Sequence, residues 1–264
     1  DRRRDGRQCL LRACHSFSQG PIVRDAAILG ILGSRKDPDR YLRWNWLAAA
    51  ALNGQATMPV RLHRHLARQT GHAERLMPMI AEVMASAGRD FTQVERFAVT
   101  VGPGTFTGVR VGVAAARAFA LSAGRPVVGI PSLEVIAARA RHVLGPSAAT
   151  RALLVATDAR RGALYCVLHA PPSSPGAPAL LTAEAAATLA LEHDALVIGS
   201  GGPLVAEAAA AAGRTITTEL PAIEPHARFL AMLAADRLPS ATVSPLYLRA
   251  PDVKPQPEPV ARRP

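Results

Sequence analysis

The sequence contains few of the residues on which extracellular and membrane proteins depend. Its 264 residues include only three cysteines, too few for a disulfide framework, and aromatic residues make up 4% of the chain. No apolar run approaches the length that spans a bilayer, and no clear signal-peptide core follows the basic start. Apolar residues reach 49%, which suits an α/β core packed from Ala, Val and Leu. We therefore expect a cytoplasmic α/β protein without a membrane segment.

Positive charge gathers at one end of the chain. The formal net charge is +11, and residues 1–71 contain 13 Lys and Arg against 5 Asp and Glu. The remaining residues contain 18 basic side chains against 15 acidic ones. A basic face for RNA is therefore not predicted on the body of the chain, and a tRNA-binding module that uses the basic arm is an alternative hypothesis.

Groups that bind metals or catalyse reactions are also scarce. His63, His65 and His72 lie in an irregular basic stretch without nearby carboxylates or thiolates, so no metal site is predicted. Asp158 has no carboxylate partner in the turn 158–162, and we interpret it as a turn former rather than a catalytic acid. Cys166 lies in a strand-like run and is predicted to be buried. No residue is predicted to be catalytic.

The richest local pattern is the glycine-rich turn 102–108, between an apolar strand-like run and an alanine-rich helix. Such a turn points backbone N–H groups outward, which is one way that proteins bind phosphate. However, neither the Lys-Ser/Thr pair nor the G-x-G-x-x-G spacing of common phosphate loops is present. An ordinary strand-to-helix turn is favoured, and the candidate cofactor contacts are Gly102, Gly104, Thr105 and, in a second glycine-rich turn, Gly201.

Four segments together carry a family resemblance. GHAERLMPMIAEV, GPGTFTGVRVGVAAARAFA, PVVGIPSLEVIA and PLYLRAPDVKPQ resemble the TsaB (YeaZ) family between about Gly71 and Gln256. The family comprises dimerisation subunits of the bacterial machinery that places threonylcarbamoyl on adenosine 37 of tRNA. The resemblance implies the two-lobed α/β fold of actin-like (ASKHA) ATPases, without the metal-binding histidines of the catalytic paralogue TsaD.

The resemblance also implies a function and partners. The expected role is that of a non-catalytic subunit that binds and activates TsaD, with TsaE in a larger complex and a self-dimer as an alternative assembly. tRNA is then contacted only through the complex. The chain is expected to have no cofactor of its own, but ATP or ADP is expected at its interface with TsaD. An actin-fold ATPase or glycoprotease-like enzyme is the alternative, but it needs an Asp near a phosphate turn in the first lobe.

The chain is expected to divide into four parts: an atypical basic segment 1–70, a first lobe 71–145, a second lobe 146–250 and a Pro-rich tail 251–264. Apolar residues at three- and four-residue spacings predict one amphipathic helix from His72 to Ala87, and small residues mark another from Gly108 to Ser122. By resemblance these helices bind the partner. The candidate contacts are His72, Leu76, Met79, Ile80, Val83, Arg110, Val111 and Ala115.

The segment 1–70 departs from the family pattern. The family opens with an apolar strand, an Asp-Thr pair and a hairpin, and neither the pair nor a clear alternation of apolar and polar residues precedes Gly71. We predict a poorly ordered segment that arises from a shifted reading frame or a misplaced gene start. A genuine basic extension is the alternative. Loss of the first strands would leave the sheet of the first lobe with exposed edges.

Overall fold

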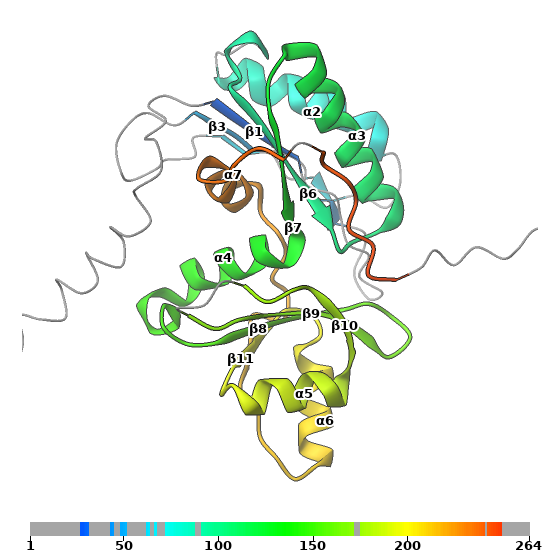
Figure 1. Cartoon of the computed structure of the whole chain (residues 1–264), viewed down its shortest axis with the longest axis vertical. Helices are drawn as coiled ribbons and strands as arrows, with labels where there is room; N and C mark the ends of the chain where they lie inside the picture. The colour runs from blue at the N-terminus through cyan, green and yellow to red at the C-terminus, as the bar shows by residue number, and fades with distance from the viewer. Residues whose placement is uncertain are drawn as a thin grey trace, which may run out of the picture.

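The protein folds into two lobes, each built on a five-stranded sheet (Figure 1). The computed structural model describes residues 27–31, 43–44, 48–51, 62–63, 66–67, 72–87, 91–171, 175–240 and 242–249. The predicted Pro-rich tail lies outside these residues. No described helix is both long and apolar enough to cross a membrane.

The sheet of the first lobe has the strand order β4-β3-β1-β6-β7. β1 runs parallel to β6 and β6 parallel to β7, whereas β3 is antiparallel to both β1 and β4. Helices α2 and α3 cover one face, and α7 and α4 cover the other. The elements are β1 (Ala27–Ile31), β3 (Ala48–Ala51), β4 (Leu62–His63), α2 (His72–Ala87), β6 (Arg96–Gly102), α3 (Phe106–Ala123), β7 (Val127–Pro131), α4 (Ser132–Leu144) and α7 (Ala227–Ala235).

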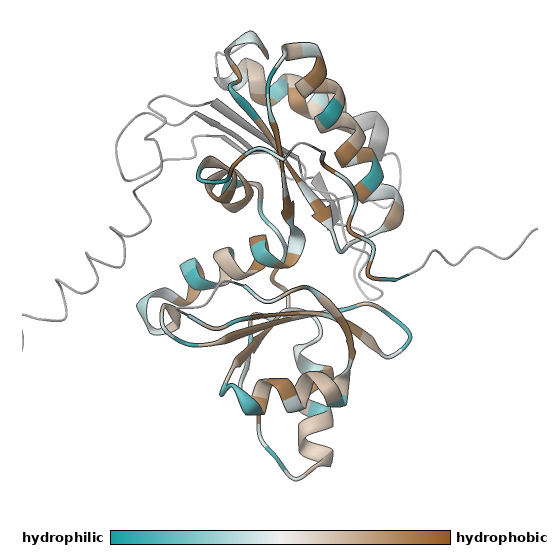
Figure 2. Ribbon diagram, viewed as in Figure 1, coloured by the Kyte–Doolittle hydropathy of each residue, from teal (hydrophilic) through white to brown (hydrophobic). Residues whose placement is uncertain are grey.

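The sheet of the second lobe has the order β10-β9-β8-β11-β12. Helices α5 and α6 pack on one face and α4 on the other, so β8 and β9 are brown along most of their length in Figure 2. The elements are β8 (Leu153–Asp158), β9 (Ala163–His169), β10 (Ala179–Thr182), α5 (Ala183–Glu192), β11 (Leu196–Ile198), α6 (Gly202–Ala211) and β12 (Thr218–Glu219). Outside the two sheets, β2 (Arg43–Trp44) pairs with β5 (Leu66–Ala67), and Phe91–Gln93 and Gly145–Ala148 form the 3-10 turns η1 and η2.

Helix α4 joins the lobes because it contributes to both cores. Val135 packs with β7 and α7 of the first lobe, whereas Leu133, Ile136 and Ala140 pack against the sheet of the second lobe. In Figure 1 the helix accordingly lies between the two sheets. The predicted two-lobed α/β fold is confirmed.

The structure corrects the prediction that no family-like strands precede Gly71. The run Ala27–Ile31 forms β1, which lies between β3 and β6 and gives β6 the parallel neighbour that was expected to be missing. A central strand that is covered on both faces shows a continuous apolar run instead of an alternation. Alternation of apolar and polar residues is therefore not a sign of such a strand. The hypothesis of a shifted reading frame stays a prediction.

Candidate functional site

The two helices predicted to bind a partner begin and end close to their expected residues. On α3 the side chain of Thr105 caps the first turn by accepting a hydrogen bond from the N–H of Gly108 at 3.3 Å. Gly124 ends the helix in the left-handed conformation, where its N–H bonds to carbonyls of the last turn. These local signals explain why the boundaries of α3 were predictable.

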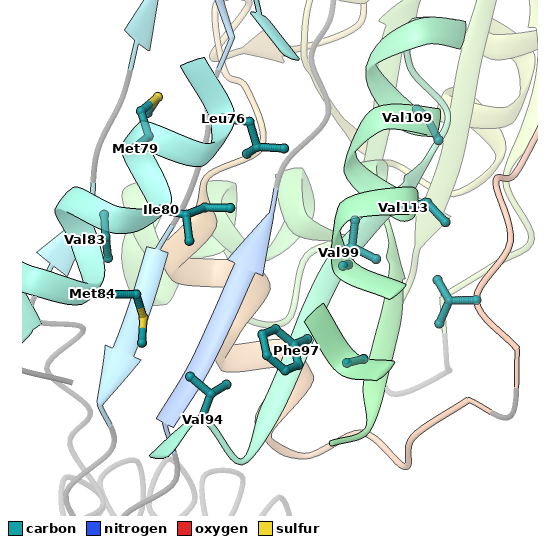
Figure 3. Close-up of a cluster of buried hydrophobic side chains, with 13 residues drawn as sticks. Leu76, Met79, Ile80, Val83, Met84, Val94, Phe97, Val99, Val109 and Val113 are labelled. Atoms are coloured by element: carbon teal, nitrogen blue, oxygen red, sulfur yellow. The ribbon is translucent and has the colours of Figure 1, made fainter. Parts of the chain in front are cut away.

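Four of the predicted partner contacts on α2 are core residues of this chain. Leu76, Met79, Ile80 and Val83 are at most 3% exposed, and Figure 3 shows them gathered with side chains from β6 and α3. The three- and four-residue spacing identified the apolar side of α2 correctly, but that side faces the protein's own sheet. These four side chains therefore offer no surface to a partner. The side chain of His72 lies outside the described residues.

The predicted contacts on α3 divide in a similar way. Val111 and Ala115 are partly buried against the same core, whereas Arg110 is exposed. Each helix keeps an exposed row of small or flexible side chains instead. The rows are Met77, Ala81 and Ala85 on α2, and Ala114 and Ala118 on α3.

The glycine-rich turn at the start of α3 has a structural explanation. Gly102 has φ of 110°, and a Cβ built there would approach the main-chain oxygen of Leu246 to 2.7 Å. Only glycine adopts this conformation readily and lets another backbone come so close. Thr105 serves as the helix cap. Two of the candidate cofactor contacts therefore have roles within the fold, and Gly104 stays a prediction.

The segment 242–249 links the two lobes. Val243 is buried in the core of the first lobe, and the N–H of Leu246 donates to the oxygen of Val101 at 2.7 Å. Further along, the guanidinium of Arg249 donates to the oxygens of Ala159 and Arg160 in the second lobe, at 3.0 and 3.3 Å. The sequence did not predict this bridge, although the run PLYLR carries part of the family resemblance.

The second glycine-rich turn packs closely on β8. The N–H of Gly201 donates to the oxygen of Ala156 at 3.0 Å, and a Cβ at Gly201 would lie 2.9 Å from the side chain of Leu164. The N–H of Asp158 donates to the hydroxyl of Ser200 at 3.2 Å. The N–H of Gly201 is thus used inside the fold, so a cofactor role for Gly201 rests on the sequence alone.

The carboxylate and thiol that drew attention in the sequence also have internal roles. Asp158 Oδ1 accepts the N–H of Arg160 at 2.7 Å, which confirms its interpretation as a turn former. Cys166 is buried, as predicted, and burial raises its pKa to about 12. Within the described ranges, no group of three or more His, Cys, Asp or Glu could hold a metal ion.

Comparison with known proteins identifies the family. A family model described as TsaD, tRNA N6-adenosine threonylcarbamoyltransferase, matches residues 66–230, more than half of the chain. The chain is similar to the TsaB protein of Escherichia coli, with 38% identity over 94 residues, which are 36% of this chain and 39% of that relative. The chain belongs to the TsaB (YeaZ) branch of the TsaD family. It thus spans about two fifths of the length of this TsaB relative.

Two further comparisons extend the match along the chain. An uncharacterised Mycobacterium tuberculosis protein is 34% identical over 189 residues, which are 70% of this chain and 78% of that relative. The structure of YeaZ from Pseudomonas aeruginosa has the same fold, with a TM-score of 0.65 and 24% identity. That match covers 84% of this chain and all of YeaZ.

Proposed function

We propose that this chain is a non-catalytic subunit that binds and activates TsaD in the N6-threonylcarbamoylation of adenosine 37 of tRNA. Membership of the TsaB branch supports a place in this machinery. The observation that carries the role of a binding subunit is the pair of exposed rows on α2 and α3. Both helices use their apolar sides for the core, and yet their exposed sides have small or flexible uncharged side chains at five positions.

The exposed rows fit a helix–helix contact. Ala81 and Ala85 follow Met77 at four-residue intervals, so the three lie on one side of α2. Ala114 and Ala118 are related in the same way on α3. Small side chains let a partner helix approach closely, and the unbranched side chain of Met77, which is 53% exposed, adapts to the surface it meets.

The chain would act through binding energy. Binding to α2 and α3 shifts the conformational equilibrium of TsaD. The size of that shift is set by the difference between the affinities of this chain for the two TsaD conformations. The internal roles of Asp158 and Cys166 support a non-catalytic assignment, because neither is a free acid or an accessible nucleophile. ATP or ADP at the TsaD interface, TsaE in a larger complex, an alternative self-dimer and a cytoplasmic location belong to the same proposal.

Co-purification with TsaD from the same genome tests the role. A carboxylate at an exposed row should disrupt a close helix contact without disturbing the core, so Ala81→Glu and Ala118→Glu are expected to lower the recovery of TsaD at least about tenfold. Ala210→Glu is the matched control, because Ala210 is an exposed helical alanine in the second lobe. Normal recovery with both row variants would overturn the interface, and no recovery with the unaltered chain would overturn the proposed function.

A further inference from the structure

An exposed aromatic and arginine cluster lies at the start of α3. Its Phe106 and Arg110 precede the row of Ala114 and Ala118 at four-residue intervals, so the cluster continues that row toward the start of the helix. The rings of Phe106 and Tyr247 are 5.3 Å apart between centroids, and they are 41% and 42% exposed. The guanidinium of Arg110 lies 3.8 Å from the centroid of Phe106, and its Nε donates to the hydroxyl of Tyr247 at 2.8 Å. Two adjacent aromatic rings on the surface form a contiguous apolar area, and such areas, unlike single exposed side chains, are typical of contacts with other molecules.

The cluster continues into the second lobe. Arg249 is two residues beyond Tyr247, a distance of at most about 7 Å along the chain. Its guanidinium meets the β8–β9 turn, where Arg160 and Arg161 are exposed. Figure 1 shows the C-terminal segment running beside α3 toward the second lobe. We call this surface the arginine–aromatic patch and define it as Phe106, Arg110, Arg160, Arg161, Tyr247 and Arg249.

The described segments that form the patch contain little negative charge. The segments that form it are α3, residues 242–249 and the turn 158–162, and their only carboxylate is Asp158. An oxygen of that carboxylate is already occupied by the N–H of Arg160. The nearly balanced charge of residues 72–264 concealed this local excess, because the count does not show where in space the arginines meet.

The chemistry of the patch favours a nucleic acid over a protein. Arginine and aromatic residues are enriched in protein interfaces as well, but burying four arginines against a protein would cost the hydration of each one unless the partner supplied a matching carboxylate for it. Phosphates pair with arginines and release counterions, while unpaired bases stack on exposed aromatic rings. A surface that alternates aromatic and arginine side chains meets both requirements.

We propose that the arginine–aromatic patch binds single-stranded RNA, with a base against Phe106 and Tyr247 and phosphates beside Arg160, Arg161 and Arg249. The inference rests on the proposed function, because a tRNA-modifying complex supplies the RNA. It goes further in assigning a direct tRNA contact to this chain instead of to its partner alone. The binding is sequence-tolerant, since stacking and phosphate contacts read no base edges.

The first test measures the affinity of the full chain for a tRNA transcript as salt is varied. The double variant Arg160→Asn/Arg161→Asn removes two charges, and asparagine tolerates the positive φ of 66° and 55° at these positions. We expect at least about tenfold weaker binding, and a log–log salt slope reduced by about 1.4 for two lost phosphate contacts. The matched control is Arg125→Asn/Arg214→Asn, two exposed arginines away from the patch, with less than about a twofold effect. The basic arm is present in every variant, so a difference between the patch and control variants does not arise from it.

The second test is ultraviolet crosslinking of the unaltered chain to the same tRNA, followed by tryptic mapping. Cleavage after arginine places Phe106 in the peptide 97–110 and Tyr247 in the peptide 238–249. Crosslinks in these two peptides are the expected result, and Phe97 does not confuse the assignment because it is fully buried. Crosslinks confined to other peptides, or equal salt slopes for the patch and control variants, would overturn the inference.

TsaD recovery, measured on the same variants, separates the two proposals. If the arginine variant loses TsaD but binds tRNA normally, the patch is a protein contact, so the RNA inference fails while the proposed function stands. If the unaltered chain never recovers TsaD but crosslinks to tRNA through the patch, the proposed function fails and the RNA site stands.

Discussion

The main-chain oxygen of His169 accepts a hydrogen bond from the guanidinium of Arg141 at 3.2 Å, while the imidazole of this histidine is buried beside it. Arg141 also donates to the main-chain oxygens of Ala148, Ala149 and Arg151, so it fastens the end of α4 to the start of the second lobe. Burial, and then the charge of Arg141, lowers the pKa of His169 to about 4. Among the described residues, Nε2 of His169 has no hydrogen-bond partner.

This arrangement predicts that the protein loses stability in mild acid. Because the pKa of His169 is lower in the folded state, the unfolded chain binds the extra proton first, and stability falls as the pH drops from about 6.5 toward 4. The loss attributable to His169 between about pH 7.5 and pH 5 should be about 2 kcal/mol, measured by urea unfolding. His169→Leu should remove this part of the pH dependence, whereas His193→Leu, at an exposed position, should keep it. An unchanged pH profile in His169→Leu would contradict the assignment.

Gly102 and Gly124 provide a matched pair for testing the close approach of the C-terminal segment. Both have positive φ, but a Cβ at Gly124 meets open space, whereas one at Gly102 meets the oxygen of Leu246. We expect Gly124→Ala to cost about 1 kcal/mol of unfolding free energy from backbone strain alone. Gly102→Ala should cost at least about 2 kcal/mol more and expose the segment 242–249 to proteolysis. Equal losses in the two variants would show that the segment does not hold its place on this turn.

Sequence patterns predicted the parts of the fold that depend on local signals. The limits of α2 and α3 follow from apolar spacing and from the capping residues Thr105 and Gly124. β1 escaped prediction because a central strand lacks the alternation that marks a half-exposed one. Whether this segment forms a strand thus depends on the sheet and helices around it and not on a local residue pattern.

The candidate site was harder to predict because its parts meet only in the folded chain. Apolar spacing identifies the apolar side of a helix but not what covers that side, and the partner contact that the resemblance implies for Leu76 falls on a side chain that packs in the core. The patch joins Arg110, Tyr247 and Arg160 from three distant segments. A count of charges along the sequence does not show which of them lie close together in the folded chain.

Arg96 is predicted to stabilise the end of α7. Its guanidinium donates to the main-chain oxygens of Ala234, Ala235 and Arg237, at 2.6, 3.0 and 2.7 Å, which satisfies carbonyls that have no partner within the helix. Arg96→Met keeps much of the side-chain volume but removes these bonds, and should lower the free energy of unfolding by about 2 to 3 kcal/mol. Arg125→Met, which loses a single long bond to the oxygen of Thr92, should cost less than about 1 kcal/mol in the same denaturation experiment.

Met79 and Met77 are close neighbours on α2, and their opposite environments predict opposite phenotypes. Met79 is buried against the sheet, so Met79→Ala should lower the free energy of unfolding by about 2 to 5 kcal/mol through the cavity that it leaves. Met77 is exposed, so Met77→Ala should change stability by less than about 0.5 kcal/mol. If the row on α2 is the partner surface, Met77→Ala should nevertheless weaken TsaD binding at least about fivefold, while the Met79→Ala protein that remains folded binds normally. Urea unfolding and co-purification on the same preparations measure both effects. The opposite result, in which folded Met79→Ala binds TsaD more weakly and Met77→Ala binds it normally, would contradict the exposed row. It would mean that the apolar side of α2 contacts TsaD, and that α2 separates from its own sheet when TsaD binds.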